Sequence, residues 1–298
     1  MGTQIRSRVA AAAAILALGV AGIGCSSKKE QEAPVATPAV TLSKQRVALG
    51  SPIEVTYRFT VAPGAPKFTE DYTAFVHFVE TNEELMWTDD HQPIIPTSKW
   101  KPGQTIETRR SIFVPIYPYV GQAAVHVGLY SRGSNRRLPL AGDDRGMRSY
   151  KVATLELLPQ SENVFLIYKD GWHQAEVNPE NAAVEWQWTK GRAVVSFRNP
   201  RRDATLYLEG DGRADLFPVP QQVSVSMGGQ LVDSFAMSNR DPVLRKMAIT
   251  AVQFGTGDMV DLEIAVDKTF VPASTPAIGG NDVRELGIRV YHLFVEPK

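Results

Sequence analysis

Residues 86–103, MWTDDHQPIIPTSKWKPG, contain the residue types in this sequence that are best suited to chemistry. Asp89, Asp90 and His91 stand side by side, and carboxylate and imidazole groups bind zinc or transfer protons in hydrolytic enzymes. The AGDDRG segment adds Asp144 as a further carboxylate, and calcium would also accept such oxygen atoms. One hypothesis is therefore a metal-assisted hydrolase that uses Asp90, His91 and Asp144.

The spacing of these residues favours a structural loop instead. Adjacent residues of a strand point to opposite faces, so three in a row cannot ligate one ion without a turn. The sequence contains no H-E-x-x-H, G-x-S-x-G or D-x-D-x-D-G motif. We expect Asp90 to accept hydrogen bonds from turn amides and His91 to bond to a backbone carbonyl. The sequence therefore predicts no catalytic residue, no metal and no cofactor.

Aromatic residues in loops are candidates for stacking on a ligand. Trp172 lies in a loop beside His173 in the DGWHQAE segment and is a more plausible exposed aromatic than Trp186 and Trp188. Trp186 and Trp188 share one face of a strand and could form a sugar platform, but burial in a core is the favoured interpretation. The candidate ligand-binding residues are Trp87, Asp90, His91, Trp100, Asp144 and Trp172.

The elements that position these residues are strands. Apolar and polar residues alternate with a period of two in many short runs that Gly, Pro and Asn segments separate, which is typical of an all-β fold. No amphipathic helix of useful length is expected, and Gly228-Gly229 predicts a tight hairpin. The fold expected is two tandem β-sandwiches, Ig-like or jelly-roll-like. The runs are 51–61, 73–80, 104–114, 123–129, 150–158, 164–168, 184–188, 193–197, 204–208, 223–227, 260–266 and 286–294.

The N-terminal residues predict export. Arg6 and Arg8 precede an apolar run over 9–24, which ends at Cys25, the single cysteine. A Pro/Ala-rich polar segment comes next, without periodicity. We expect a signal peptide over 1–24, a lipidated cysteine and flexible tether over 25–41, and β-sandwich domains over 42–159 and 160–298.

The segment Gly22-Ile23-Gly24-Cys25 resembles the bacterial lipoprotein signal, in which a peptidase cuts before a cysteine that then carries lipid. The resemblance implies acylation of Cys25 and attachment to a membrane of the cell envelope. Ser26 after the cysteine suggests the outer membrane of a Gram-negative cell, facing the periplasm or the surface. No cysteine then remains for a disulfide, so core packing must stabilise the fold.

Motifs in the expected β-sandwich domains resemble those of known envelope modules. The motifs D-D-H-x-P at 89–93 and P-T-S-x-W-x-P-G at 96–103, followed by G-L-Y at 128–130 and R-L-P at 137–139, resemble a β-sandwich module. That module occurs in a family of uncharacterised bacterial lipoproteins and is attached to bacterial membrane glycosyltransferases. The D-x-R-x-L-G element at 282–287 resembles the closing strand of galactose-binding-like jelly rolls. These resemblances imply non-catalytic envelope modules.

Composition bounds the partners. Lys+Arg and Asp+Glu both total 32, so no basic excess indicates nucleic acid. Asp282 and Arg284 share a face two residues apart, and a structural ion pair is the favoured interpretation. The expected function is non-catalytic binding or scaffolding, with a glycan or an envelope protein as partner. A structural subunit of an envelope assembly stays open as an alternative, as does the hydrolase.

Overall fold

The computed structural model describes residues 32–238 and 241–298. Residues 34–298 form one compact unit. Regular structure in the described ranges consists of strands and three short 3₁₀ turns, at Thr97–Lys99, Gln160–Glu162 and Pro272–Ser274. The all-β prediction is therefore confirmed. No helix in the described ranges is long and apolar enough to cross a membrane.

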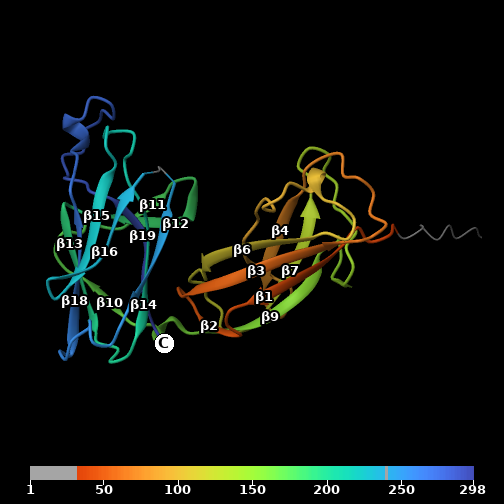
Figure 1. Ribbon diagram of the computed structural model, residues 1–298, viewed down its shortest axis with the longest axis horizontal. Helices are drawn as coiled ribbons and strands as arrows, with labels where there is room; N and C mark the ends of the chain where they lie inside the picture. Colours follow the sequence, from red (N-terminus) through yellow and green to blue (C-terminus); the bar gives the residue numbers. More distant parts are fainter. Residues whose placement is uncertain (1–31, 239–240) are drawn as a thin grey trace, which may run out of the picture. The chain divides into compact units, whose positions relative to one another are not determined.

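The strands up to residue 158 form two sheets (Figure 1). In the described structure these strands form no ladder with any strand that follows residue 158. The three-stranded sheet has the order β1 (Ala36–Leu42), β3 (Pro52–Val61), β6 (Thr105–Phe113). The other sheet has the order β2 (Arg46–Ala48), β9 (Tyr150–Leu158), β7 (Gly121–Tyr130), β4 (Thr73–Val79), β5 (Leu85–Thr88), with β8 (Asp143–Asp144) paired to β9.

One apolar core lies between these two sheets. The alternation of β3 supplies it directly, because every second side chain of a strand points to the same face. The buried residues of that parity are Ile53, Val55, Tyr57, Phe59 and Val61. Apolar surface removed from water contributes about 25 cal/mol per Å². This packing stabilises the sandwich, as expected for strands that carry no cysteine.

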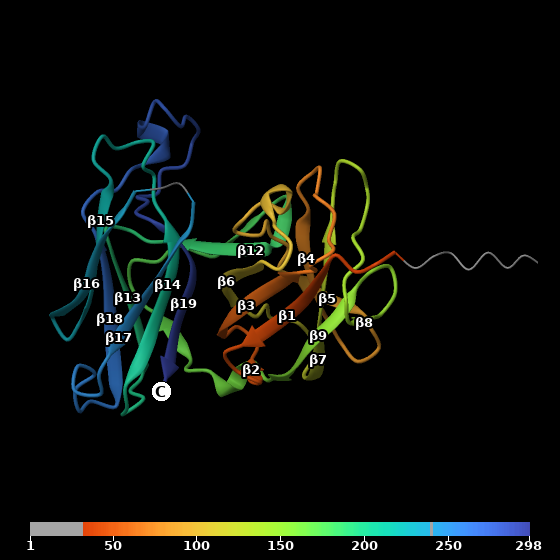
Figure 2. The same ribbon diagram turned by 45° about the vertical axis from the view of Figure 1, so that its right-hand side comes forward.

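The strands from residue 166 onward form two further sheets (Figure 2). One has the order β10 (Leu166–Tyr168), β13 (Arg192–Arg198), β18 (Met259–Val266), β15 (Gln221–Met227), β16 (Gln230–Met237). The other has the order β11 (Glu176–Asn178), β12 (Asn181–Trp188), β19 (Arg289–Pro297), β14 (Ala204–Asp211), β17 (Val243–Ile249).

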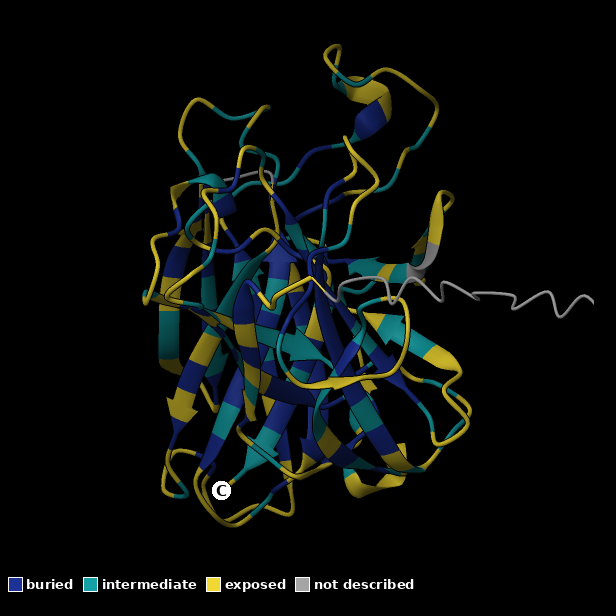
Figure 3. Cartoon of the chain, turned by 90° about the vertical axis from the view of Figure 1, so that its right-hand side faces the viewer, coloured by how far each residue is buried: buried dark blue, intermediate teal, exposed yellow. Residues whose placement is uncertain are grey.

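A second core joins these sheets, and its buried residues include Val195, Leu206, Val225, Leu262 and Val295. Figure 3 shows dark-blue buried bands concentrated in the strands, where they alternate with teal and yellow ones, whereas the loops are mostly yellow and teal. The hairpin between β15 and β16 turns at Gly228 and Gly229, whose φ angles are +55° and +79°. Such angles favour glycine, so the predicted tight hairpin is confirmed. We propose that the two sets of sheets are the two domains expected from the sequence.

The predicted tether requires a correction, because β1 begins at Ala36, inside the segment expected to be unstructured up to residue 41. Its side chains alternate between buried and exposed, and it pairs with β3 in register from Ala36 opposite Val61. Pro38 is tolerated because β1 is an edge strand. The predicted signal peptide, Cys25 and the tether up to residue 31 lie outside the described residues.

Candidate functional site

Three neighbouring strands bring a polar and aromatic group together on the outer face of the β11-β12-β19-β14-β17 sheet. Trp188 of β12 pairs in register with Arg289 of β19, and Arg289 pairs with Asp211 of β14. Val290, next to Arg289, points into the second core. Because strand residues alternate between faces, Arg289 points away from that core.

Arg289 and Asp211 form the centre of this group. Arg289 donates from Nε to Oδ1 at 2.8 Å and from Nη2 to Oδ2 at 2.5 Å, and the Tyr291 hydroxyl donates to Oδ2 at 2.8 Å. The Asp211 side chain is 1% exposed and that of Arg289 is 29% exposed. The carboxylate is therefore buried and receives three charge-assisted or hydroxyl hydrogen bonds, which fix its position.

These contacts also set the protonation states. Burial acts to lower the pKa of Arg289, but the hydrogen bonds and charge of Asp211 outweigh it and raise the pKa. Burial, and then the bond to Asp211, raise the pKa of Tyr291 well above its usual range. Arg289 is therefore a permanent cation, and Tyr291 is a neutral donor.

Aromatic rings surround the Arg289 guanidinium. Its Cζ atom lies 5.4 Å from the ring centroid of Trp186 and 5.6 Å from the centroids of Trp188 and Tyr291. The rings of Trp186 and Tyr291 meet edge to face at 6.1 Å. Cation–π attraction of this kind holds a guanidinium rigidly. The donors of Arg289 that Asp211 does not use therefore have a defined orientation.

A cavity of about 260 Å³ opens beside Arg289 and is lined by Trp188, Gly212, Arg213 and Arg289. Arg213 donates from Nε and Nη2 to the two carboxylate oxygens of Asp215 at 2.9 and 2.8 Å. Its guanidinium lies 5.3 Å from the ring centroid of Phe270. The cavity thus presents two guanidinium groups, each already paired with an aspartate, beside one indole ring.

The tryptophan pair lies outside the second core. Trp188, Phe270 and Leu286 form a separate buried cluster, against which Trp186 packs. Trp188 is 8% exposed, and the Nε1 atom of Trp186 is buried without a hydrogen-bond partner among the described residues. The favoured interpretation of the sequence is that both rings lie in a core. Both rings do belong to a core cluster, a smaller one on the face of the sheet opposite the second core, and Trp188 also lines the cavity.

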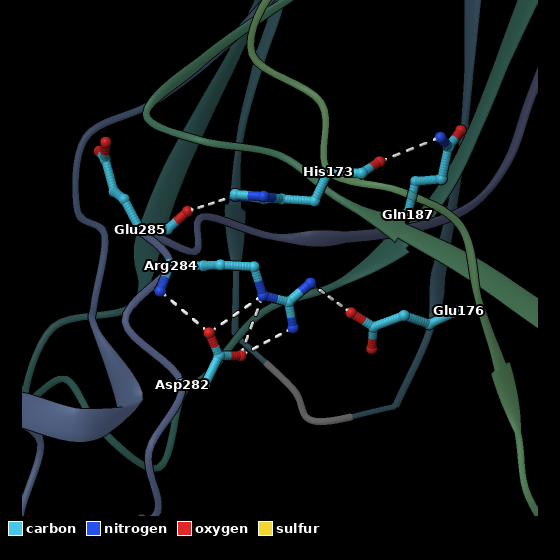
Figure 4. A network of polar contacts seen from close by, with 6 residues as sticks. All are labelled: His173, Glu176, Gln187, Asp282, Arg284 and Glu285. Carbon is cyan, nitrogen blue, oxygen red and sulfur yellow. Dashed lines mark hydrogen bonds and ion pairs between the residues drawn. The ribbon is translucent and has the colours of Figure 1, made fainter.

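A network of polar contacts holds the loop that contains Asp282, Arg284 and Glu285 (Figure 4). Arg284 donates from Nε and Nη2 to the carboxylate of Asp282 and from Nη1 to Glu176 at 2.6 Å. Hydrogen bonds from Arg284 lower the pKa of Asp282 to about 2. The His173 Nε2 atom lies 2.7 Å from the backbone oxygen of Glu285. The expected Asp282–Arg284 ion pair is present, and it connects this loop to β11.

The Asp89-Asp90-His91 segment makes structural contacts. Arg110 donates from Nε to both carboxylate oxygens of Asp89 at 2.9 Å, and the Tyr57 hydroxyl donates to the same carboxylate at 2.8 Å. Asp90 accepts from a backbone amide of β4 at 2.9 Å. His91 Nδ1 lies 2.7 Å from the backbone oxygen of Asp89. These are the backbone bonds that the loop interpretation predicts, with a strand amide in place of turn amides.

The hydrolase hypothesis finds no assembled ion site. Burial lowers the pKa of His91, which keeps the imidazole neutral. Asp144 is exposed and accepts from the backbone amide of Gly146 at 2.8 Å. Across 32–238 and 241–298, no group of three or more His, Cys, Asp or Glu side chains could hold a metal ion. Asp90, His91 and Asp144 therefore do not converge there.

The three tryptophans predicted as ligand contacts, Trp87, Trp100 and Trp172, pack against other parts of the protein. Trp87 stacks on Phe78 with centroids 4.5 Å apart, and Trp100 is 5% exposed and donates from Nε1 to the Ile95 oxygen. The sequence predicts that Trp172 is an exposed aromatic residue in a loop. It is partly buried against the second core, and its Nε1 donates to a backbone carbonyl at 2.9 Å. A buried indole N–H needs a hydrogen-bond partner, and the backbone carbonyl supplies it.

The sequence reasoning did not single out Arg289 and Tyr291, although the predicted parity already placed both on the outer face, on either side of the buried Val290. The predicted parity puts Val290, His292 and Phe294 on one face. The register with β14 shifts between Glu209 and Gly210, so His292 is exposed, whereas Leu293 and Val295 point into the core. A bulge inserts one residue and reverses the parity of the rest of the strand.

The scan against protein-family models finds no match, and no curated protein matches. Solved structures similar to this chain include carbohydrate-binding modules. The CBM51-2 and INT domains of ZmpB from Clostridium perfringens, in complex with GlcNAc, are 11% identical with a TM-score of 0.25, covering 87% of this chain and 48% of that one. The tandem CBM22 domains of Paenibacillus barcinonensis Xyn10C are 10% identical with a TM-score of 0.25, covering 85% and 80%.

A structure of another kind is also similar. The alkylpurine DNA glycosylase AlkC of Pseudomonas fluorescens, bound to DNA with an abasic site analogue, is 15% identical with a TM-score of 0.27, covering 42% of this chain and 30% of that one. The chain thus spans less than half of the AlkC and ZmpB chains. Likeness at this level assigns no activity to the chain.

Proposed function

We propose that this chain is a lipid-anchored protein of the bacterial envelope that binds carbohydrate, without catalysing a reaction, in the cavity beside Arg289. The observation that supports the proposal is the combination of Trp188 with two aspartate-paired arginines around one small cavity.

The chemistry of the cavity suits a neutral polyol. A sugar hydroxyl both donates and accepts hydrogen bonds. The C–H groups of the sugar ring form an apolar face, which can stack on an aromatic ring. Arg213 and Arg289 offer the N–H groups that their aspartates leave unused, while the aspartates cancel most of their charge. A cavity of about 260 Å³ is slightly below the ~300–1,000 Å³ of drug-sized ligand sites, which fits one sugar unit.

The carboxylates beside the cavity are tied to structural partners, which favours binding over catalysis. Asp211 receives two bonds from Arg289 and one from Tyr291, and Asp215 receives two bonds from Arg213. A glycoside hydrolase needs one carboxylic acid that can give its proton to the leaving group. The oxygens of Asp211 and Asp215 are occupied by these donors, so neither carboxyl group is free to contact a glycosidic oxygen.

The anchor is proposed from the sequence alone, since Cys25 lies outside the described residues. Each buried CH₂ of an acyl chain contributes about 0.8 kcal/mol, so several chains on one cysteine attach a protein almost permanently. Mass spectrometry of the N-terminal peptide from membranes tests this part. A mass that corresponds to acylated Cys25 is expected, and an unmodified or uncleaved N-terminus contradicts it.

A glycan array tests the ligand. We expect the full chain to bind a subset of envelope glycans and the variant Trp188→Ala to lose at least about five-fold in affinity, because stacking of a nucleic-acid base on an aromatic ring is worth about 1–3 kcal/mol and a sugar face makes the same kind of contact. The variant Phe235→Ala is the matched control, since Phe235 also packs under an arginine, Arg245, but does not line the cavity.

Two results would count against glycan binding. An array without any specific signal, together with no glycan recovered from envelope extracts, removes the ligand class. Equal losses in Trp188→Ala and Phe235→Ala would show that a general loss of stability causes the effect. Circular dichroism of both variants at the assay temperature separates the two causes.

A further inference from the structure

A second pocket, of about 540 Å³, lies at one end of the first sandwich. Its walls are mostly apolar and include Val61, Phe68 and Trp100. The rings of Phe68 and Trp100 meet edge to face at 5.9 Å, and Gly103 donates to the Val61 oxygen at 3.1 Å, which fixes the loop. The pocket is therefore preformed, and its volume is typical of a ligand site.

Three lysines surround this apolar pocket: Lys67, Lys99 and Lys101. All three are exposed, and across the described residues none forms a hydrogen bond or ion pair with its ammonium group. Asp71 and Glu70 are acids of the adjacent segment. The amide and hydroxyl of Ser98 hold Asp71, with a weaker influence from Lys99, and the hydroxyls of Tyr72, Ser131 and Ser134 hold Glu70. The rim therefore carries excess positive charge above an apolar floor.

The described chain enters the sandwich at this pocket. Val35 donates to the Pro139 oxygen and accepts from Ala62, and Ala36 pairs in register with Val61, a residue of the pocket wall. Nine residues separate Cys25 from Val35. Ten Cα–Cα steps reach at most about 35 Å. If Cys25 carries lipid, this end of the sandwich stays within that distance of the bilayer.

We propose that this pocket binds an anionic phospholipid of the membrane, with acyl carbons against Phe68 and Trp100 and the headgroup phosphate on the lysines. The choice of a membrane lipid as occupant rests on the proposed anchor at Cys25. The lipid holds the sandwich with its Lys67–Lys99–Lys101 end on the bilayer. An apolar floor with a cationic rim matches one acyl chain below one phosphate.

Each lysine near an anionic surface contributes roughly five-fold in affinity. On an anionic bilayer the three lysines together contribute on the order of 100-fold, and on a single soluble lipid, which carries one negative charge, they contribute less. An uncharged apolar ligand would gain the free energy of burying its apolar surface but not the electrostatic contribution of the lysines. Discrimination between anionic and zwitterionic lipid is therefore the property that separates this proposal from simple hydrophobic binding.

Calorimetric titration of the full chain with short-chain lipids, below their micelle concentrations, tests the proposal. Dihexanoyl phosphatidylglycerol is expected to bind saturably, and dihexanoyl phosphatidylcholine at least about ten-fold more weakly. The triple variant Lys67→Ala, Lys99→Ala, Lys101→Ala is expected to lose the preference for phosphatidylglycerol. The control Lys190→Ala removes an exposed lysine of the second sandwich and is expected to bind as the unaltered chain does.

Lysine acetylation followed by mass spectrometry gives a second measurement on the unaltered chain. Phosphatidylglycerol is expected to slow acetylation of Lys67, Lys99 and Lys101 and to leave Lys190 and Lys298 unchanged. Equal binding of both lipids, equal binding of free glycerol 3-phosphate, or absence of binding and protection each overturns the proposal. Glycan binding at Arg289 and the mass of Cys25 are separate readouts, so their failure is distinguishable from failure here.

Discussion

Arg289 clamps Asp211 through two parallel hydrogen bonds of 2.8 and 2.5 Å across adjacent strands, at positions 78 residues apart in the chain. Asp211 is almost wholly buried, while the far side of Arg289 reaches a cavity. One pair therefore stabilises the second sandwich and orients donors toward a ligand. Removal of the aspartate should affect stability first, and removal of a cavity arginine should affect binding.

Asp211→Ala is expected to lower the free energy of unfolding by about 3 kcal/mol, because it leaves a partly buried guanidinium without its partner. Asp282→Ala breaks an ion pair whose side chains are 32% and 37% exposed, and should cost about 1 kcal/mol or less. Urea unfolding followed by circular dichroism measures both. An equal loss of unfolding free energy in the two variants would contradict the burial of the Asp211–Arg289 pair.

The Asp89-Asp90-His91 loop should respond as a structural element. Asp89→Ala leaves Arg110 and the Tyr57 hydroxyl without their acceptor and is expected to cost about 3 kcal/mol. Asp90→Ala loses one bond from a strand amide and should cost about 1 kcal/mol. Elemental analysis of the purified protein accompanies the unfolding curves. A stoichiometric bound ion that Asp90→Ala removes would revive the hydrolase hypothesis.

Gly212 is expected to resist enlargement. A Cβ atom there would lie 2.7 Å from Met237 Cβ and 2.8 Å from Gln221 Oε1, the acceptor that holds the Arg213 amide. Gly212→Ala should therefore cost about 1–3 kcal/mol and weaken ligand binding at the cavity. Gly64→Ala is the matched control, since nothing lies within 4 Å of its Cβ position. A neutral Gly212→Ala would mean that this loop yields freely.

Stability should fall in mildly acidic solution. Burial lowers the pKa of His77, His91 and His126 below the value of about 6.5 in an unfolded chain. The unfolded chain therefore binds more protons below that pH, so the free energy of unfolding is highest above about 6.5 and declines as the pH falls toward the folded values. Urea unfolding at several pH values between about 8 and 5.5 should show this decline. His91→Gln should make it shallower, and an unchanged slope would contradict a buried neutral His91.

Much of the fold could be predicted from alternation alone, because a half-buried strand must place apolar residues at every second position. β3 and β9 illustrate this, since their bounds match the predicted runs closely. β1 could not be recognised as easily. Its alternation rests on Ala36, Pro38 and Val40, small or helix-breaking residues that also fill flexible linkers.

The candidate site was less accessible to sequence reasoning. The prediction concentrated on adjacent polar residues, Asp89, Asp90 and His91, whereas the Arg289 cavity combines residues from β12, the loop after β14, and β19. Such combinations depend on strand order, which alternation does not specify. The bulge in β19 reversed the parity only from His292 onward, so it changed the predicted faces of the end of the strand but not that of Arg289.

The most direct test of the central claim is a calorimetric titration of Arg213→Gln with the glycan that the array selects. Arg213 lines the cavity, yet its ion pair with Asp215 is partly exposed, so its loss should leave the fold intact. The account predicts at least about a ten-fold rise in Kd, since a hydrogen bond from a charged group contributes about 1.5–3 kcal/mol. Arg245→Gln, which removes an arginine that pairs with Asp233 away from the cavity, should leave Kd unchanged. An unaltered Kd in Arg213→Gln, with the folded state intact, would contradict the claim that this cavity binds carbohydrate.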